Sequence, residues 1–124
     1  MKIAIYILGI LGVITSGAYG SVLLETVEGF APHQRAHLSG MVSAGYLHFA
    51  VAIAGIAGLF MAWKGQLALA GGLMLGAGVI GFLFAAMSVP VPEVVMMGLF
   101  FDAPLVVGGI VALFAHAKAR RVAT

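Results

Sequence analysis

Four long apolar runs, separated by short polar or proline-containing segments, make up almost the whole chain. They cover residues 3–24, 32–63, 67–88 and 94–118. The shortest of them, at about 22 residues, is long enough for roughly 33 Å of α-helix, and the hydrocarbon core of a bilayer is about 30 Å thick. Backbone amides in lipid must be paired within their own segment, so each run predicts a transmembrane helix.

The segments between the runs indicate how the helices follow one another. The turn at residues 64–66 is so short that the helices on either side of it must be antiparallel. Pro32 suits the first turn of the second helix, and Pro90 and Pro92 end the third. The pattern predicts an all-α fold, an integral membrane four-helix bundle of up-down topology, as a single domain over residues 1–124.

The first run also has features of a secretory signal, since it follows Lys2 and contains the small residues of segment 15–18. The apolar region of a signal peptide is about 7 to 15 residues long, whereas this run has about 22. We therefore predict a first helix that is not cleaved.

Composition supports lipid as the solvent of this chain. Of 124 residues, 63% are hydrophobic and 8% are charged, whereas a soluble domain has about a quarter charged residues. The 18 glycines interleave with the apolar residues, and small residues let membrane helices approach closely. Gly72 and Gly76 have the spacing of such a packing surface. We expect contacts with membrane lipid, and with other membrane subunits or further copies of the chain through Gly and Ala faces.

The basic residues indicate the orientation. In this layout five of the six lie at one side of the membrane, Lys2, Lys64, Lys118, Arg120 and Arg121, and only Arg35 lies at the other. The positive-inside rule then puts both termini in the cytoplasm, in a bacterial-type inner membrane. The net charge of +2 reflects this asymmetry and does not indicate nucleic acid, and the absence of cysteine excludes thiolate metal sites.

Two ionisable residues are expected at the same depth inside the bundle. His48 lies about 15 residues from Trp63, and Asp102 about 16 from Lys118, which is roughly 22 to 24 Å of helix in each case. The second and fourth helices are parallel in this topology, so His48 and Asp102 can meet in the outer half of the membrane.

Other polar groups are expected near this layer. Thr15, Ser16 and Tyr19 of the first helix come to nearly the same depth, and Pro104 should disturb the fourth helix and free backbone carbonyls nearby.

Polar groups in lipid usually face the bundle interior, and two roles suit His48 and Asp102. One is a buried hydrogen bond or ion pair that fixes helix packing. The other is cofactor binding together with Tyr46, either a proton or quinone-hydroxyl site or b-type haem. Haem ligation would require a second axial His or Met at equal depth, and no second histidine matches the depth of His48. The methionines that could reach the outer half are Met41, Met96 and Met97. We expect no cofactor, with haem b or quinone as the alternatives.

His33 and His37 are one helical turn apart and could hold a transition metal, with Glu25, Glu28 or Glu93 nearby in the outer loops. On one continuous helix, His33, His37 and His48 would share a face, within about 60° of rotation. The alternative is a contact at the membrane interface or with another subunit.

Four short segments resemble the YgdD-like family of small four-helix inner-membrane proteins of unknown function. They are Gly-Ala-Tyr-Gly at 17–20, Tyr-Leu-His-Phe-Ala at 46–50, Gly-Phe-Leu-Phe at 81–84, and the segment 104–109, which begins with proline and ends in two glycines. The resemblance implies the fold and an emphasis on His48, and it implies no activity.

The sequence contains no Ser-His-Asp order, paired-carboxylate motif or nucleotide-binding loop, so we predict no catalytic activity of its own. We expect a small accessory subunit of a larger inner-membrane complex, for example a respiratory or other energy-transducing one. The alternatives are a quinone- or haem-binding redox anchor that uses His48, and a proton or small-solute pathway formed by an oligomer.

Overall fold

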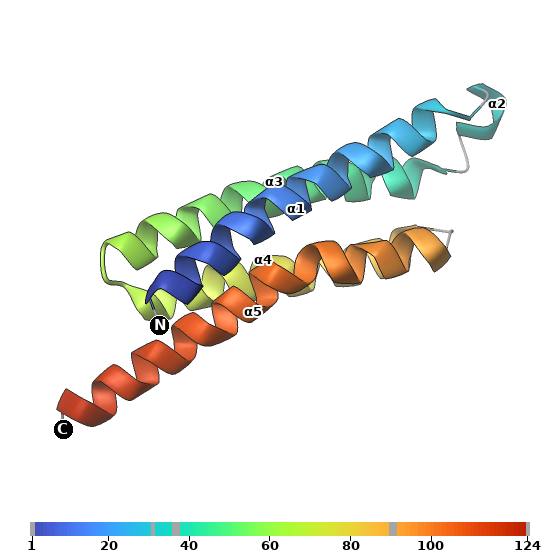
Figure 1. Cartoon of the computed structure of the whole chain (residues 1–124). Helices are drawn as coiled ribbons and strands as arrows, with labels where there is room; N and C mark the ends of the chain where they lie inside the picture. The colour runs from blue at the N-terminus through green and yellow to red at the C-terminus, as the bar shows by residue number, and fades with distance from the viewer. Residues whose placement is uncertain (1, 31, 36–37, 90–91, 124) are drawn as a thin grey trace.

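The computed structural model describes residues 2–30, 32–35, 38–89 and 92–123 (Figure 1). They form five helices and no strand: α1 (Lys2–Glu28), α2 (Pro32–Arg35), α3 (Ser39–Trp63), α4 (Leu67–Ser88) and α5 (Pro92–Ala123). Four of these, α1, α3, α4 and α5, are long and apolar enough to cross a membrane. The predictions of an all-helical chain and of four such helices are confirmed.

The four long helices form a ring in which each packs against two neighbours. Helix α1 lies between α3 and α5, and α4 contacts the same two helices from the other side. Both chain ends and the α3–α4 turn lie at one end of the bundle, and α2 and the start of α5 lie at the other (Figure 1). Neighbouring helices are therefore antiparallel, while α3 and α5 run parallel on one diagonal of the ring.

Helix α1 continues to Glu28, whereas the sequence predicted an end at residue 24. The Thr26 hydroxyl donates a hydrogen bond to the Val22 carbonyl at 2.7 Å, and Leu23 and Val27 are buried in the core. Hydropathy marks where polar side chains begin, but the backbone hydrogen bonds of a helix continue beyond that point. The first prediction was therefore too short.

The single helix predicted over residues 32–63 is described as two, α2 and α3, on either side of residues 36–37, which lie outside the described part of the chain. The prediction of a face shared by His33 and His48 assumed one continuous helix, and His33 instead lies on α2. Helix α3 begins level with the end of α4, since a methyl group added at Gly40 would overlap the carbonyl of Ser88.

The connection between α3 and α4 is as tight as predicted, and α4 has the predicted bounds. Gly65 has a φ of 82°, in the left-handed region where glycine is favoured. The Gly65 and Gln66 amides donate to the carbonyls of Ala62 and Met61, at 3.0 and 2.9 Å. These bonds satisfy the last carbonyls of α3 and reverse the chain within three residues.

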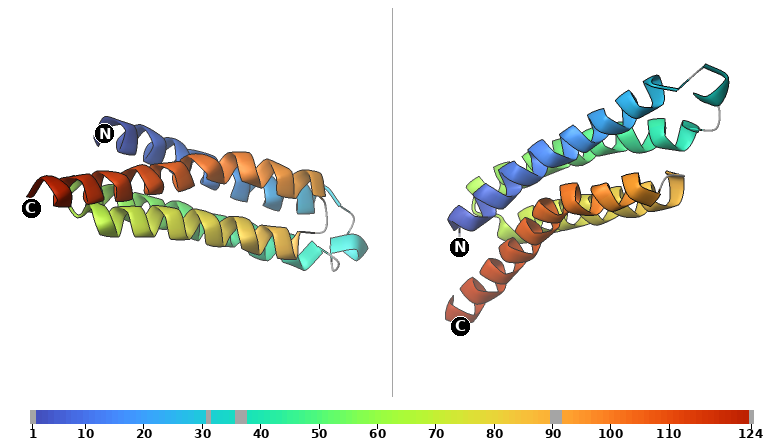
Figure 2. Two further views of the ribbon diagram at one scale, coloured as in Figure 1. Left: turned by 90° about the horizontal axis from the view of Figure 1, so that it is seen from below. Right: turned by 45° about the vertical axis from the view of Figure 1, so that its right-hand side comes forward.

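Helix α5 is longer than predicted at both ends, because it begins at Pro92 and continues to Ala123. Proline suits a first helical turn, where its missing amide would have no helical partner in any case. Inside the helix, Pro104 cannot donate to the carbonyl of Phe100. Helix α5 bends between its orange and red parts (Figure 2), and proline is the usual cause of such a bend.

Glycines allow the helices to approach one another. A methyl group added at Gly12 of α1 would lie 2.7 Å from the Cα atom of Leu105 on α5. One added at Gly20 of α1 would lie 2.8 Å from the carbonyl oxygen of Gly45 on α3. The backbones of α1 and of its two neighbours are therefore in direct contact at these positions.

On α4 the glycines that pack differ from those predicted. Methyl groups at Gly71 and Gly78 would lie 2.9 Å from the Gly109 carbonyl oxygen and 2.7 Å from a methyl group of Val106. At Gly72 and Gly76 nothing lies within 4 Å. Because α4 is rotated so that both face outward, Gly72 and Gly76 make no packing contact within the described chain, and their role as a packing surface for another helix stays a prediction.

Candidate functional site

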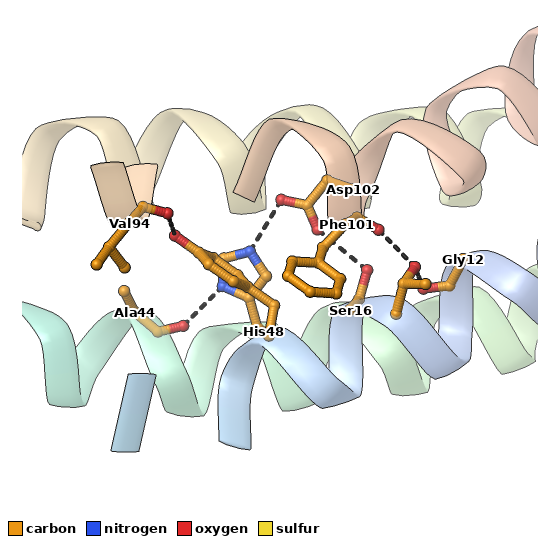
Figure 3. Close-up of polar contacts among 9 residues, drawn as sticks. Gly12, Ser16, Ala44, His48, Val94, Phe101 and Asp102 are labelled. Atoms are coloured by element: carbon orange, nitrogen blue, oxygen red, sulfur yellow. Dashed lines mark hydrogen bonds and ion pairs between the residues drawn. The ribbon is translucent and has the colours of Figure 1, made fainter. Parts of the chain in front are cut away.

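Three polar side chains are buried together in the centre of the bundle, and we call them the buried polar cluster (Figure 3). They are Ser16 of α1, His48 of α3 and Asp102 of α5, with exposed fractions of 0%, 0% and 1%. Each comes from a different helix, so the cluster exists only when the bundle is assembled.

Asp102 joins the other two members of the cluster. Its Oδ2 lies 2.9 Å from His48 Nε2, and its Oδ1 accepts a hydrogen bond from the Ser16 hydroxyl at 3.0 Å. The second ring nitrogen of His48, Nδ1, lies 2.8 Å from the carbonyl oxygen of Ala44, one turn earlier on α3. Within the described residues, no buried polar side-chain atom lacks a hydrogen-bond partner.

These contacts determine how many protons the pair holds. A carbonyl oxygen only accepts, so His48 Nδ1 must carry the hydrogen that it donates to Ala44. The bond between His48 Nε2 and Asp102 Oδ2 then contains one further proton, placed on either atom. The pair is an imidazolium with a carboxylate, or an imidazole with a carboxylic acid. Its net charge is zero in both cases, which suits a site surrounded by apolar helices.

An aromatic side chain covers the histidine. Tyr19 of α1 packs edge-on against the His48 ring, with 4.6 Å between centroids and 79° between planes, and Phe101 stacks on Tyr19. The Tyr19 hydroxyl donates to the Val94 carbonyl at 2.8 Å. Gly98 makes room for this hydroxyl, because a methyl group there would lie 2.8 Å from its oxygen. The surroundings of His48 are therefore closely packed and its orientation is fixed.

A further hydrogen bond lies beside the proline of α5. The Thr15 hydroxyl lies 2.5 Å from the Phe101 carbonyl oxygen and 3.2 Å from the Gly12 carbonyl oxygen. Phe101 is in the turn that precedes Pro104, where helical hydrogen bonding is interrupted. Pro104 was expected to free carbonyls near this layer, and the carbonyl that Thr15 contacts is that of Phe101, next to the Phe100 carbonyl that loses its helical donor.

The contact between His48 and Asp102 is confirmed, as is the presence of Ser16 and Tyr19 in the same layer. Tyr46 lies outside the cluster, with an exposed fraction of 63%. Sequence reasoning did not identify Ala44 as a partner of His48. The four-residue spacing between them on one helix is the signal that could have found it.

The described part of the chain contains no metal site formed by the histidines that were predicted as metal ligands. His33 is exposed on α2, and His37 lies outside the described residues. In the ranges that the structure describes, no group of three or more His, Cys, Asp or Glu side chains could hold a metal ion. The metal site at His33 and His37 stays a prediction.

The cluster does not fit an axial haem ligand. Iron needs the lone pair of a ring nitrogen, yet Nδ1 of His48 donates to Ala44 and Nε2 is hydrogen-bonded to Asp102. It does not fit a quinone ring either, because His48 and Asp102 are at most 1% exposed and Tyr46 is elsewhere. In this arrangement His48 and Asp102 are already hydrogen-bonded to other groups of the protein, so they offer no hydrogen bond to a bound molecule.

A cavity of about 240 Å³ lies between α4 and α5, behind Asp102. Apart from Asp102, its walls are glycine, alanine and apolar side chains, among them Gly78, Phe82 and Val106. Both oxygens of Asp102 are bonded to Ser16 and His48 (Figure 3), so the cavity has an apolar surface. It suits hydrocarbon, not a polar substrate.

Comparisons of the chain with models of protein families, with curated proteins and with solved structures found no match. The resemblance to the YgdD-like family stays a prediction from four short segments. The fold and the site define an all-helical chain with four helices able to cross a membrane, three of them joined by a closed polar cluster.

Proposed function

We propose that the chain is a small, non-catalytic membrane subunit that docks a transmembrane helix of another protein in a groove between α3 and α4. It spans a bacterial-type inner membrane four times and supports the assembly of a larger complex. The observation that carries this proposal is the outward orientation of Gly72 and Gly76, with nothing within 4 Å of a methyl group added at either position.

The groove has the surface that a second helix requires. It has a volume of about 360 Å³, and small residues of both helices line it, Ala50 and Ala54 on α3 and Gly72 and Gly76 on α4. Glycines one turn apart let another helix approach to backbone contact, which is a main source of affinity between helices in lipid. Elsewhere on α4, Gly71 and Gly78 serve this purpose within the bundle. Gly72 and Gly76 have no such contact within the described chain.

The buried polar cluster supports a structural role. Its polar atoms are hydrogen-bonded to one another and to the Ala44 carbonyl, and the buried Tyr19 hydroxyl beside it donates to the Val94 carbonyl, so among the described residues no polar atom of this layer is left for a passing molecule. A proton or solute pathway and a redox anchor both require a polar group that a passing or bound molecule can reach. Because the cluster joins α1, α3 and α5 through hydrogen bonds, its role in this proposal is to stabilise the bundle whose surface forms the groove.

The distribution of charge supports the proposed orientation. Lys2, Lys64 and the three basic residues at the end of α5 lie at the end of the bundle that holds the α3–α4 turn (Figure 1). Positive charge in the cytoplasmic segments is the main determinant of membrane topology. Both termini would then be cytoplasmic.

Site-specific photo-crosslinking in intact membranes tests the groove. A crosslinking residue in place of Ile80, which lines the groove, should form an adduct with one other membrane polypeptide. The same residue in place of Ile10, which is exposed on α1, should not. Gly72→Ile should abolish the adduct because it fills the groove, whereas Ala86→Ile, an exposed position on α4 that does not line the groove, should leave it unchanged.

The same experiment shows how the proposal fails. Identical adducts from Ile80 with and without Gly72→Ile would mean that the groove is not the docking surface. An adduct made only with a second copy of this chain would replace the subunit by a homo-oligomer.

A further inference from the structure

The last turns of α5 extend beyond the rest of the bundle. Helix α5 has 32 residues and starts beside the end of α4, which has 22. The last fully buried residue of α5 is Ala112, which packs against Ile5, Ala62 and Ala70 near the α3–α4 turn. Ala115 still packs partly against these residues, and beyond it α5 continues for about two turns at 3.6 residues per turn and projects past the α3–α4 turn (Figure 1).

One face of this extension combines an apolar ring with two cations. Phe114, Lys118 and Arg121 are spaced by four and three residues, so they lie within about 60° of one another on the helix. Together with Ala117 they line a hollow on the side of α5. Phe114 is 68% exposed, although it is one of the largest apolar side chains of the chain. This face is distinct from the groove between α3 and α4.

The order of these groups along the helix matches the order of groups in a phospholipid. Phe114 lies about 6 Å closer to the bundle than Lys118, and Arg121 lies about 4.5 Å further out. An acyl chain beside the bundle would contact Phe114, and the phosphate above it would lie level with the two cations. Arginine binds phosphate through paired N–H groups, and lysine adds a compact charge.

Charge complementarity selects the kind of lipid. Lys2 and Lys64 lie at the same end of the bundle, and Glu25, Glu28 and Glu93 all lie toward the opposite end. A cationic membrane-facing end attracts anionic headgroups at roughly 1 kcal/mol per basic residue near the surface. A zwitterionic lipid carries its own cation and lacks this net attraction.

We propose that the face formed by Phe114, Ala117, Lys118 and Arg121 is a binding site for one anionic phospholipid of the leaflet at this end of the bundle. The phosphate lies between Lys118 and Arg121, and an acyl chain lies along Phe114. The inference rests on the membrane insertion of the proposed function and is independent of any protein partner. The positive-inside rule predicts only that basic residues gather at this end of the bundle, whereas this proposal assigns one lipid to one face of one helix.

Native mass spectrometry of the full chain tests the site. The protein is released from micelles that contain equal amounts of phosphatidylglycerol and phosphatidylcholine, and the retained lipids are counted. Wild type should retain phosphatidylglycerol preferentially. Removing both cations in the Lys118→Gln/Arg121→Gln variant should lower that preference by about 25-fold, on the order of fivefold for each cation.

Two variants make the comparison specific. Arg120→Gln removes the same charge one residue away, but about 100° round the helix, and should keep the preference. Lys118→Arg keeps the charge at the site and should also keep it. All these positions are exposed near the end of α5, and the unfolding temperature of each variant shows whether it is folded.

Three results would overturn the proposal. They are equal retention of the two lipids by wild type, an unchanged preference in the Lys118→Gln/Arg121→Gln variant, and a loss of about fivefold in Arg120→Gln, as large as the loss assigned to each cation of the site. The third would show a diffuse attraction of the whole basic end. None of them would affect the crosslinks from the groove between α3 and α4, so the two proposals fail separately.

Discussion

His48 Nε2 on α3 lies 2.9 Å from Asp102 Oδ2 on α5, across the diagonal of the helix ring. These two helices are not neighbours, because α1 and α4 lie between them and make the extensive contacts. Ser16 of α1 completes the link at Asp102 Oδ1. The cluster therefore joins, through hydrogen bonds, three helices of which two are not neighbours in the ring.

Asp102→Ala should destabilise the bundle by about 2 kcal/mol, because it leaves His48 Nε2 and the Ser16 hydroxyl buried without a partner. Asp102→Asn should lower stability by less than about 1 kcal/mol, since the amide can donate to Nε2 and accept from Ser16. Unfolding of the detergent-solubilised protein by increasing SDS, followed by circular dichroism, would measure both free energies.

The comparison between the two variants tests whether the proton shared by the pair lies on His48 or on Asp102. If Asp102→Asn is as unstable as Asp102→Ala, the shared proton lies on His48, and the bundle needs an imidazolium beside a carboxylate. Ser16→Ala is a useful control, since it removes the other hydrogen bond to Asp102 and leaves the bond to His48 in place.

Haemin added to the purified protein should produce no Soret band that depends on His48, because both ring nitrogens are engaged. Absorption spectra of wild type and of His48→Ala, recorded at the same haemin concentrations, should coincide. A Soret band in wild type that is lost in His48→Ala would contradict the closed arrangement and restore the redox-anchor alternative.

Gly12→Ala should lower the free energy of unfolding by about 2 kcal/mol, since its methyl group would lie 2.7 Å from the backbone of Leu105 and push α1 away from α5. Gly76→Ala should change it by less than about 0.5 kcal/mol, because nothing lies within 4 Å of the added methyl group. SDS titration of the purified variants compares the two. Equal effects at the two positions would contradict the observed rotation of α4.

Thr15→Val keeps the shape of the side chain but removes the hydroxyl that donates to the Phe101 carbonyl, before Pro104. We expect a loss of about 1 kcal/mol, the usual contribution of such a bond between membrane helices. Thr15→Ser should retain most of the wild-type stability in the same titration, because the hydroxyl remains. A loss as large in Thr15→Ser would assign the effect to the methyl group.

The sequence by itself determined the number of helices that can cross a membrane and the bounds of α4. The reason is that a bilayer demands about 20 apolar residues per span with all backbone bonds made internally, which leaves a clear signal in hydropathy. The regular rise of a helix was also sufficient to place His48 and Asp102 at the same depth. Their contact could therefore be anticipated from counting residues.

Only the tertiary structure decided how α4 is rotated, since α4 carries no buried polar side chain that would indicate its inward face. The apolar residues surround each helix on all sides, so lipid and protein interior are nearly equivalent environments for them, and the choice of face depends on steric fit. For this reason Gly71 and Gly78 pack inward while Gly72 and Gly76 face outward. Tyr46 is exposed two residues before the buried His48. The structure also showed that His48 Nδ1 donates to the Ala44 carbonyl. Only with this contact known could we infer that His48 Nε2 and Asp102 share one proton.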